Sequence, residues 1–87
     1  MTPDEMILIC AVRYTLGRMS YMVSVICDYV KGKRSELSYN CINIIIHNIE
    51  EELERYHNLG ETLGMECDEK NWLELLNVLK AEVDKND

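Results

Sequence analysis

The sequence predicts an all-α fold, a small bundle of three to four helices that is expected to be oligomeric. Apolar residues recur at the spacing of a helix in several segments, and none of these segments alternates apolar and polar residues as a strand does. The chain has one proline, at position 3, where it can begin a helix but cannot interrupt one. Apolar residues are 47% of the chain and charged residues 29%, which suits a folded domain and excludes a disordered tail.

The length of the chain indicates a single helical domain that covers residues 1–87. A domain of this size buries only about 60–65% of the surface that its unfolded chain exposes. A lone monomer is therefore marginally stable, and we expect self-association or a partner to add stability.

The first helix is expected over residues 3–16. Thr2 is a good N-cap, Pro3 then occupies the first helical position, and Glu5 has the spacing of a capping box. A helix that is apolar on most sides is buried on more than one side, so we expect a homo-oligomer. The apolar residues of this segment face several directions: Leu8, Val12 and Leu16 form one line, whereas Met6, Ile9 and Cys10 lie elsewhere.

A second helix is expected over residues 19–31, with Gly17 between the two. Gly17 either breaks the helix or lets another backbone approach closely, and the sequence leaves both open. Basic residues at positions 31, 33 and 34 surround Gly32 at the end of this segment. Cations at a helix C-terminus offset the helix dipole, and we favour this explanation over a phosphate-binding role. The apolar stripe of the segment is Met19, Met22, Val23, Ile26 and Val30.

Two further helices are expected over residues 35–58 and 68–84. Ser35 is the expected N-cap of the first of them, and Gly60 lies in its expected C-cap region. Asp68 is the expected N-cap of the last helix. The stripes that define these helices are Ile42, Ile45, Ile46, Ile49, Leu53 and Tyr56, and then Trp72, Leu75, Leu76, Leu79 and Val83.

The net charge of −7 is concentrated in the second half of the chain. Residues 1–49 carry five basic and four acidic side chains, whereas residues 50–87 carry four basic and twelve acidic ones. Phosphate attraction needs a basic surface, so direct nucleic-acid binding is not expected. A dense row of carboxylates can instead occupy the basic groove of a protein that binds nucleic acid, and solubility is the competing explanation. The expected partner-binding acidic face is Glu50, Glu51, Glu54, Glu61, Glu66 and Asp68.

No arrangement of residues in the sequence predicts catalysis, a metal site or a cofactor. The spacings of cysteine and histidine match none of the paired-ligand motifs of metal sites. Cys10, Cys27 and Cys41 have apolar neighbours, so we expect mostly buried, unreactive thiols, and Cys67 lies between two acids. The sequence also lacks a glycine-rich phosphate loop. The protein is therefore not expected to be an enzyme.

The segment of residues 13–21 is unusual because it places two arginines, two tyrosines, two hydroxyl side chains and a glycine between apolar flanks. Arg13 lies in an otherwise apolar helix, so it must reach solvent, an acid such as Asp28, or an anionic ligand. Guanidinium groups and tyrosine rings can bind the phosphates and the base of a nucleotide. An arginine–acid pair that fixes helix packing is the other interpretation. The candidate ligand-binding residues are Arg13, Tyr14, Arg18 and Tyr21.

The same segment, Arg13-Tyr14-x-Leu16-Gly17-Arg18-x-Ser20-Tyr21, resembles a motif of small proteins encoded by phages of Gram-positive bacteria. In that group the motif reads approximately R-Y-A-L-G-R-x-T-Y, so Thr15 and Ser20 depart from it mildly. The resemblance implies a phage origin and no particular mechanism. Small acidic phage proteins are often inhibitors of bacterial immunity, and anti-CRISPR proteins are similar in size and charge. The resemblance extends over residues 6–76 and includes Asp28-Tyr29, Gly64-Met65-Glu66-Cys67-Asp68 and Trp72.

Three functions follow as expectations. The first is a phage-encoded inhibitor that binds a host defence protein, such as a nucleic-acid-binding effector, through the acidic face. The second is an oligomeric sponge that sequesters a nucleotide immune signal in an arginine–tyrosine pocket, and the third is a structural or regulatory phage accessory protein. The longest apolar run, residues 6–12, is far shorter than the roughly 20 residues that span a bilayer, and no signal peptide is recognisable. We therefore expect a protein of the host cytoplasm that does not bind membranes.

Overall fold

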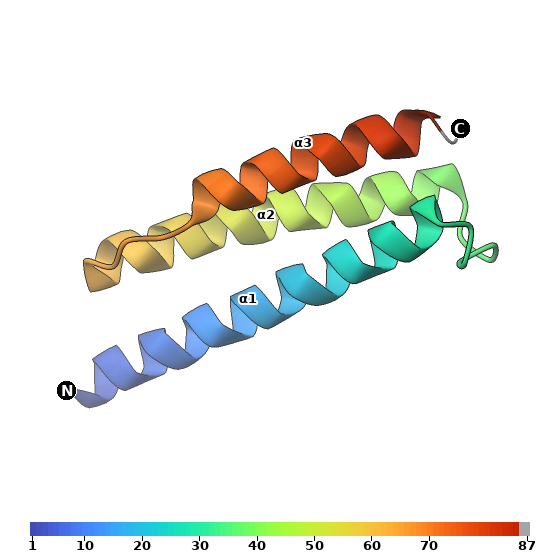
Figure 1. Ribbon diagram of the computed structural model, residues 1–87. Helices are drawn as coiled ribbons and strands as arrows, with labels where there is room; N and C mark the ends of the chain where they lie inside the picture. Colours follow the sequence, from blue (N-terminus) through green and yellow to red (C-terminus); the bar gives the residue numbers. More distant parts are fainter. Residues whose placement is uncertain (86–87) are drawn as a thin grey trace.

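The computed structural model describes residues 1–85 and shows, within them, three α-helices and no strand (Figure 1). The helices are α1 (Pro3–Val30), α2 (Tyr39–Leu63) and α3 (Glu69–Lys85). Each helix runs antiparallel to the one before it, so α1 and α3 point the same way along an elongated body. The predicted all-α bundle is confirmed, with three helices rather than four in the described residues.

The two helices expected over residues 3–16 and 19–31 are one continuous helix, α1, which passes through Gly17 without a break. A glycine inside a helix costs about 1 kcal/mol relative to alanine, which weakens a helix but does not end it when packing holds both sides. Thr15 and Met19, on either side of Gly17, are fully buried in the bundle and supply that packing. The start of α1 is as predicted, because Thr2 Oγ1 accepts a hydrogen bond from the Glu5 N–H at 3.2 Å.

The start of α2 lies four residues later than predicted. Ser38, and not Ser35, is the N-cap, and its Oγ accepts a hydrogen bond from the Cys41 N–H at 3.2 Å. Residues 31–38 form turns between the helices, in which Gly32 adopts a positive φ of 78° that favours glycine. Because both serines can cap a helix, composition alone did not distinguish them.

The end of α2 lies beyond the expected position 58, because Gly60 is inside the helix and Gly64 is the C-cap. Gly64 has the left-handed φ of 67° that ends many helices, and its N–H donates to the Glu61 carbonyl at 3.1 Å. Gly60 is buried, and a Cβ on it would overlap the Sγ of Cys67. The glycine at position 60 is thus required by close packing of the following loop rather than by helix termination.

The last helix, α3, begins at Glu69, directly after Asp68. The Asp68 carbonyl accepts a hydrogen bond from the Asn71 N–H at 3.0 Å, whereas the Asp68 carboxylate accepts one from the Tyr56 hydroxyl at 2.7 Å. The second bond ties the α2–α3 connection back onto α2. Burial, and then this bond, raise the pKa of the Tyr56 hydroxyl.

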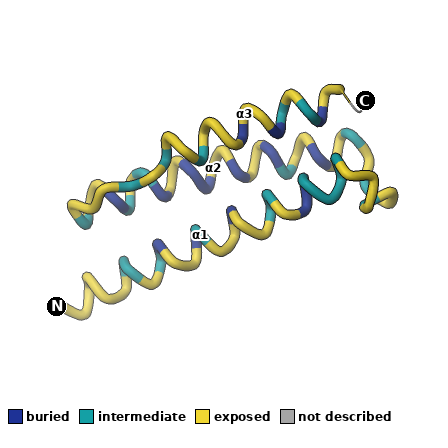
Figure 2. Tube along the Cα trace, viewed as in Figure 1, coloured by how far each residue is buried: buried dark blue, intermediate teal, exposed yellow. Residues whose placement is uncertain are grey.

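Buried apolar residues lie along the inner faces of the helices in two clusters of the described chain (Figure 2). The first nine residues of α1 contribute none of them: burial on this helix begins at Val12. No helix within residues 1–85 combines the length and apolar character needed to cross a membrane. The cluster toward the α1–α2 connection is Ile26, Ile42, Ile46, Ile49, Leu76, Leu79 and Val83, and the other cluster is Val12, Met19, Leu53 and Tyr56.

Candidate functional site

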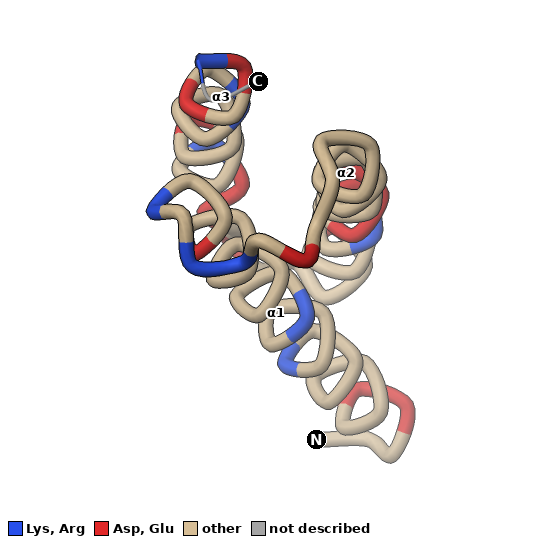
Figure 3. The backbone as a smooth tube through the Cα atoms, turned by 90° about the vertical axis from the view of Figure 1, so that its right-hand side faces the viewer, with Lys and Arg blue, Asp and Glu red and all other residues tan. Residues whose placement is uncertain are grey.

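The structure divides the expected acidic face into two parts, and two of its six acids, Glu50 and Glu54, line a groove between α2 and α3. Carboxylates from both helices line this groove, whose volume is about 340 Å³. Leu53 and Leu73 give it an apolar floor, and Leu73 is 47% exposed. Figure 3 shows the acidic residues of α2 beyond its first turns, in the half of the helix that leads to α3. We name this feature the acidic groove, and its lining residues are Glu50, Leu53, Glu54, His57, Glu69 and Leu73.

His57 joins the two helices that form the acidic groove. Its Nδ1 lies 2.7 Å from Glu69 Oε1 on α3, and its Nε2 lies 2.9 Å from Glu61 Oε1 on α2. The hydrogen bond with Glu69, followed by the charges of Glu61 and Glu69, raises the pKa of His57 above its ordinary value of 6.5. Glu61 therefore borders the acidic groove through its contact with His57, a residue that was not predicted from the sequence as part of a site.

We expect this contact to make the stability of the bundle depend on pH between 6 and 8. A histidine with a raised pKa in the folded state stabilises most below its unfolded pKa, about 6.5, and this stabilisation is lost as pH rises through the folded pKa. Urea unfolding at several pH values should therefore show higher stability at pH 6 than at pH 8. His57→Gln should flatten the difference, whereas His47→Gln, which removes a pair within α2, should keep it. An unchanged pH profile in His57→Gln would contradict the role of this contact.

The remaining acids of the expected face lie elsewhere or are engaged. Glu51 is one residue, or about 100°, around α2 from Glu50 and pairs with His47 at 3.0 Å. Asp68 accepts the Tyr56 hydrogen bond, and Glu66 is exposed in the connection before α3. Glu50 itself lies 3.4 Å from the Lys80 ammonium. The structure thus gathers Glu50, Glu54 and Glu61 and separates Glu51, Glu66 and Asp68 from them.

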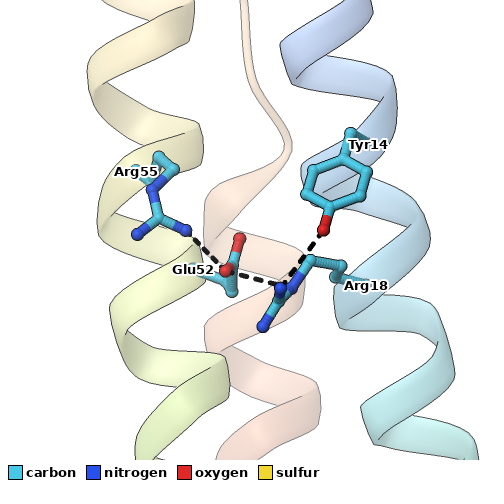
Figure 4. Close-up of polar contacts among 4 residues, drawn as sticks. All are labelled: Tyr14, Arg18, Glu52 and Arg55. Atoms are coloured by element: carbon cyan, nitrogen blue, oxygen red, sulfur yellow. Dashed lines mark hydrogen bonds and ion pairs between the residues drawn. The ribbon is translucent and has the colours of Figure 1, made fainter.

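A buried carboxylate, Glu52, holds α1 against α2 (Figure 4). Its Oε1 lies 3.2 Å from Arg18 Nε on α1 and 2.5 Å from Arg55 Nη1 on α2. Its other oxygen, Oε2, is buried and accepts no hydrogen bond from the described residues. This role was not predicted from the sequence, although Glu52 is three residues after Ile49 and four before Tyr56, which places it on the apolar stripe of α2.

The four candidate ligand-binding residues do not form one pocket. Tyr14, Arg18 and Tyr21 line a hollow of about 540 Å³ on α1, together with Gly17 and Met22. Arg18 Nη1 donates to the Tyr14 hydroxyl at 3.3 Å while its Nε faces Glu52, so Arg18 makes the arginine–acid pair of the second interpretation. These contacts raise the pKa of Arg18. Arg13 lies outside this hollow and is exposed beside Met6, Ile9 and Cys10.

The expectation of mostly buried cysteines is wrong. Cys10 and Cys41 are exposed, and Cys27 and Cys67 are partly buried, all four as free thiols. Hydrogen bonding to Ser38 at the start of α2 lowers the pKa of the Cys41 thiol, the opposite of the effect expected from apolar neighbours. Apolar sequence neighbours did not bury these cysteines because neighbouring residues on a helix point in different directions. Among residues 1–85, no group of three or more His, Cys, Asp or Glu side chains is placed to hold a metal ion.

Comparisons of the chain with protein-family models, curated proteins and solved structures find no match. The residues and their geometry therefore carry the functional argument. Two hollows of the described chain contain residues that the sequence predicted to bind a partner or a ligand: the acidic groove between α2 and α3, and the hollow on α1 around Gly17.

Proposed function

We propose that this protein acts by binding a positively charged protein through the acidic groove, with no catalytic step. The observation that carries the proposal is the convergence of Glu50, Glu54 and Glu69 on a groove with an apolar floor. Carboxylates spread for solubility alone do not need to converge from two helices onto exposed leucine surface. The arrangement supports a docking site more than a merely solvated face.

The chemistry of the groove fits a basic helix or loop of a protein. Leu73 offers apolar contact area. Glu54 attracts lysine and arginine side chains, together with Glu50 and Glu69, which also pair with Lys80 and His57. Protein interfaces commonly combine an apolar centre with a polar rim in this way. A small cation would gain nothing from the leucines, so a protein segment is the partner that uses both parts.

Competition with nucleic acid is the proposed consequence of this binding. A protein whose basic groove holds nucleic acid presents the charge that the acidic groove attracts, and occupying that groove blocks it. Together with the resemblance of residues 13–21 to phage-encoded proteins, this supports an inhibitor of a bacterial defence protein, acting in the host cytoplasm in the manner of anti-CRISPR proteins.

Charge reversal in the acidic groove should abolish binding. We expect the double variant E50K/E54K to lose at least about 100-fold in affinity, because attraction becomes repulsion at the centre of the site. A suitable probe is a 20-residue amphipathic helical peptide of lysine and leucine, titrated by calorimetry at 50 mM and 300 mM NaCl. The same variant is then measured against any host protein that native mass spectrometry finds attached to the protein purified from cells.

The matched control is E36K/E51K, which changes the net charge by the same amount at positions outside the acidic groove. This control should keep most of the affinity, and binding of the original chain should weaken steeply with salt. Equal loss in both double variants would mean that only net charge matters. Binding that ignores salt would likewise contradict the proposal.

The nucleotide sponge has weaker support as a second candidate. The hollow on α1 presents the rings of Tyr14 and Tyr21, which suits a base. Its cation, Arg18, is already compensated by Glu52, and Arg13 lies outside the hollow, so little positive charge remains for phosphates. Calorimetry with a cyclic dinucleotide decides the matter, since heat that Arg18→Ala removes would favour the sponge. If the protein binds neither the basic peptide nor the cyclic dinucleotide, the structural or regulatory accessory role becomes the better hypothesis.

A further inference from the structure

The outward face of α1 carries apolar side chains that the bundle does not cover. Val12, Met19 and Ile26, spaced by seven residues, face the core. Tyr14 and Tyr21 point away from the core and are 65% and 68% exposed. Each follows a core residue by two positions, which is about 200° around the helix. Ile7 continues this row at 66% exposure, and the exposed residues Cys10, Gly17 and Ser24 form a second row beside it. Two such rows with a seven-residue repeat form the seam of a pair of packed helices.

Within residues 1–85, no contact of Gly17 explains why a glycine stands there. A Cβ at this position would meet no atom within 4 Å, and its backbone is helical. Alanine would fit and would stabilise the helix more than glycine does. A glycine on the outside of a long helix is useful when a neighbouring molecule must come close to the backbone.

The hollow around Gly17 has the form that receives a side chain from a facing helix. Tyr14, Gly17, Arg18 and Tyr21 stand at positions i, i+3, i+4 and i+7, which is the set of four residues that surrounds each inserted side chain in packed helices. Gly17 forms the floor, and the Arg18–Tyr14 hydrogen bond holds one wall in place. The hollow of about 540 Å³ is large enough to accept a tyrosine side chain.

We propose that the occupant is a second copy of this chain, packed antiparallel along the outward face of α1. The two α1 helices cross the symmetry axis midway between Tyr14 and Gly17. Each large residue of one row then faces a small residue of the other copy, over about 25 Å of helix. Tyr14 of each copy fills the hollow over Gly17 of the other. The other layers pair Ile7 with Ser24 and Tyr21 with Cys10. Alternating large and small residues across facing positions is how closely packed helices interdigitate.

Charge complementarity also favours a second copy in the antiparallel direction. Figure 3 shows acidic residues at the start of α1 and basic residues just past its end. Antiparallel pairing brings Asp4 and Glu5 of one copy toward Lys31 and Lys33 of the other, whereas parallel pairing sets like charges side by side. The helix dipoles of the two α1 helices also oppose each other favourably in the antiparallel arrangement.

The dimer is independent of the proposed function, because the acidic groove is formed by α2 and α3 only. Two copies joined through α1 carry two acidic grooves, so a partner with two basic sites would be held by both. Loss of the dimer should lower apparent affinity for such a partner while leaving the affinity of a single groove unchanged. A titration with such a partner therefore distinguishes a chain that does not dimerise from a chain whose acidic groove does not bind.

Sedimentation equilibrium tests the dimer with the full chain at micromolar to millimolar concentration. We expect a mass of twice 10.2 kDa for the original chain. Gly17→Leu fills the hollow and should weaken dimerisation at least 100-fold. Circular dichroism should show equal or greater helicity, because a Cβ here meets no described atom within 4 Å and leucine favours helix more than glycine does. Asn43→Leu, an exposed change on α2, is the control that should remain dimeric. A monomeric mass for the original chain throughout this range, or an undiminished dimer in Gly17→Leu, would overturn the proposal.

Cross-linking tests the antiparallel direction. The native Cys10 is expected to oppose Tyr21 of the second copy, so mild oxidation of Y21C should form two symmetric disulfides between Cys10 and the introduced cysteine. Peptide mapping by mass spectrometry identifies the link, and the variant C10S/Y21C should lose it. Links that join Cys10 to Cys10, a nucleotide retained in the hollow in native mass spectra, or no intermolecular link would each overturn the antiparallel pairing.

Discussion

Replacing Ile49 with alanine is expected to lower the free energy of unfolding by about 3 kcal/mol. Ile49 is 1% exposed on α2 and lies in the cluster that also contains Ile26 of α1 and Leu76 of α3. Removal of its three outer carbons leaves a cavity where all three helices meet, and helix backbones cannot collapse into it fully. For a domain of this size, the loss corresponds to a fall in Tm of roughly 12–24 °C.

Ile44→Ala is a control of the same chemistry on the same helix. Ile44 is 61% exposed, so its truncation should change stability by less than about 0.5 kcal/mol. Urea unfolding followed by circular dichroism measures both variants, and the Gly17→Leu background removes any contribution from self-association. Similar losses at the two positions would contradict the packing described for α2.

Removal of both arginines that face Glu52 is the second large effect that we expect. The Glu52 side chain is 5% exposed in the original chain, and in R18A/R55A its carboxylate loses both partners. An uncompensated buried charge is costly, so the free energy of unfolding should fall by about 2–3 kcal/mol. The arginines themselves are about half exposed and can return to water, which makes the carboxylate the sensitive member of the group.

Removal of the Glu52 carboxylate, with both arginines kept, should be tolerated. Glu52→Met keeps the volume, removes the charge and the unsatisfied Oε2, and releases two arginines that already contact solvent. Its stability should equal or exceed that of the original chain. The same urea measurements, again in the Gly17→Leu background, compare the two variants. A larger loss in Glu52→Met than in R18A/R55A would show that the ion pairs are net stabilising.

The helices were predictable from the sequence, but their ends were less so. Apolar periodicity located most of each stripe because it reports on which side of a helix is buried, although Leu75 of the α3 stripe is 39% exposed. Ser38 and Gly64 act as caps where Ser35 and Gly60 were expected, since capping depends on the local backbone and on what packs nearby. At Gly60 the deciding contact is Cys67, which folds back over the helix from the following loop. A contact between a helix and the loop that follows it cannot be predicted from the types of the residues alone.

The candidate site was predictable in composition but not in arrangement. The acids of α2 were identifiable by their density, whereas the contribution of Glu69 and Leu73 from α3 depends on how the helices dock. The buried position of Glu52 could have been predicted from periodicity, because Glu52 lies on the apolar stripe of α2. An acid on such a stripe must find partners inside the fold. Arg18 is the partner from α1, so part of the unusual arginine–tyrosine segment is explained by internal packing.

The two apolar clusters also imply an order in which the bundle forms. Ile26 and Ile42, in one cluster, are separated only by the α1–α2 connection and its flanking turns, whereas Val12 and Tyr56, in the other, lie far apart along the chain. Closing the longer loop first costs about 1 kcal/mol more in chain entropy. Once the nearer pair has met, the remaining turns of α1 and α2 are brought together step by step at little further entropic cost. The connection end of the hairpin is therefore the natural folding nucleus, and the free end of α1 is the last part to find its place.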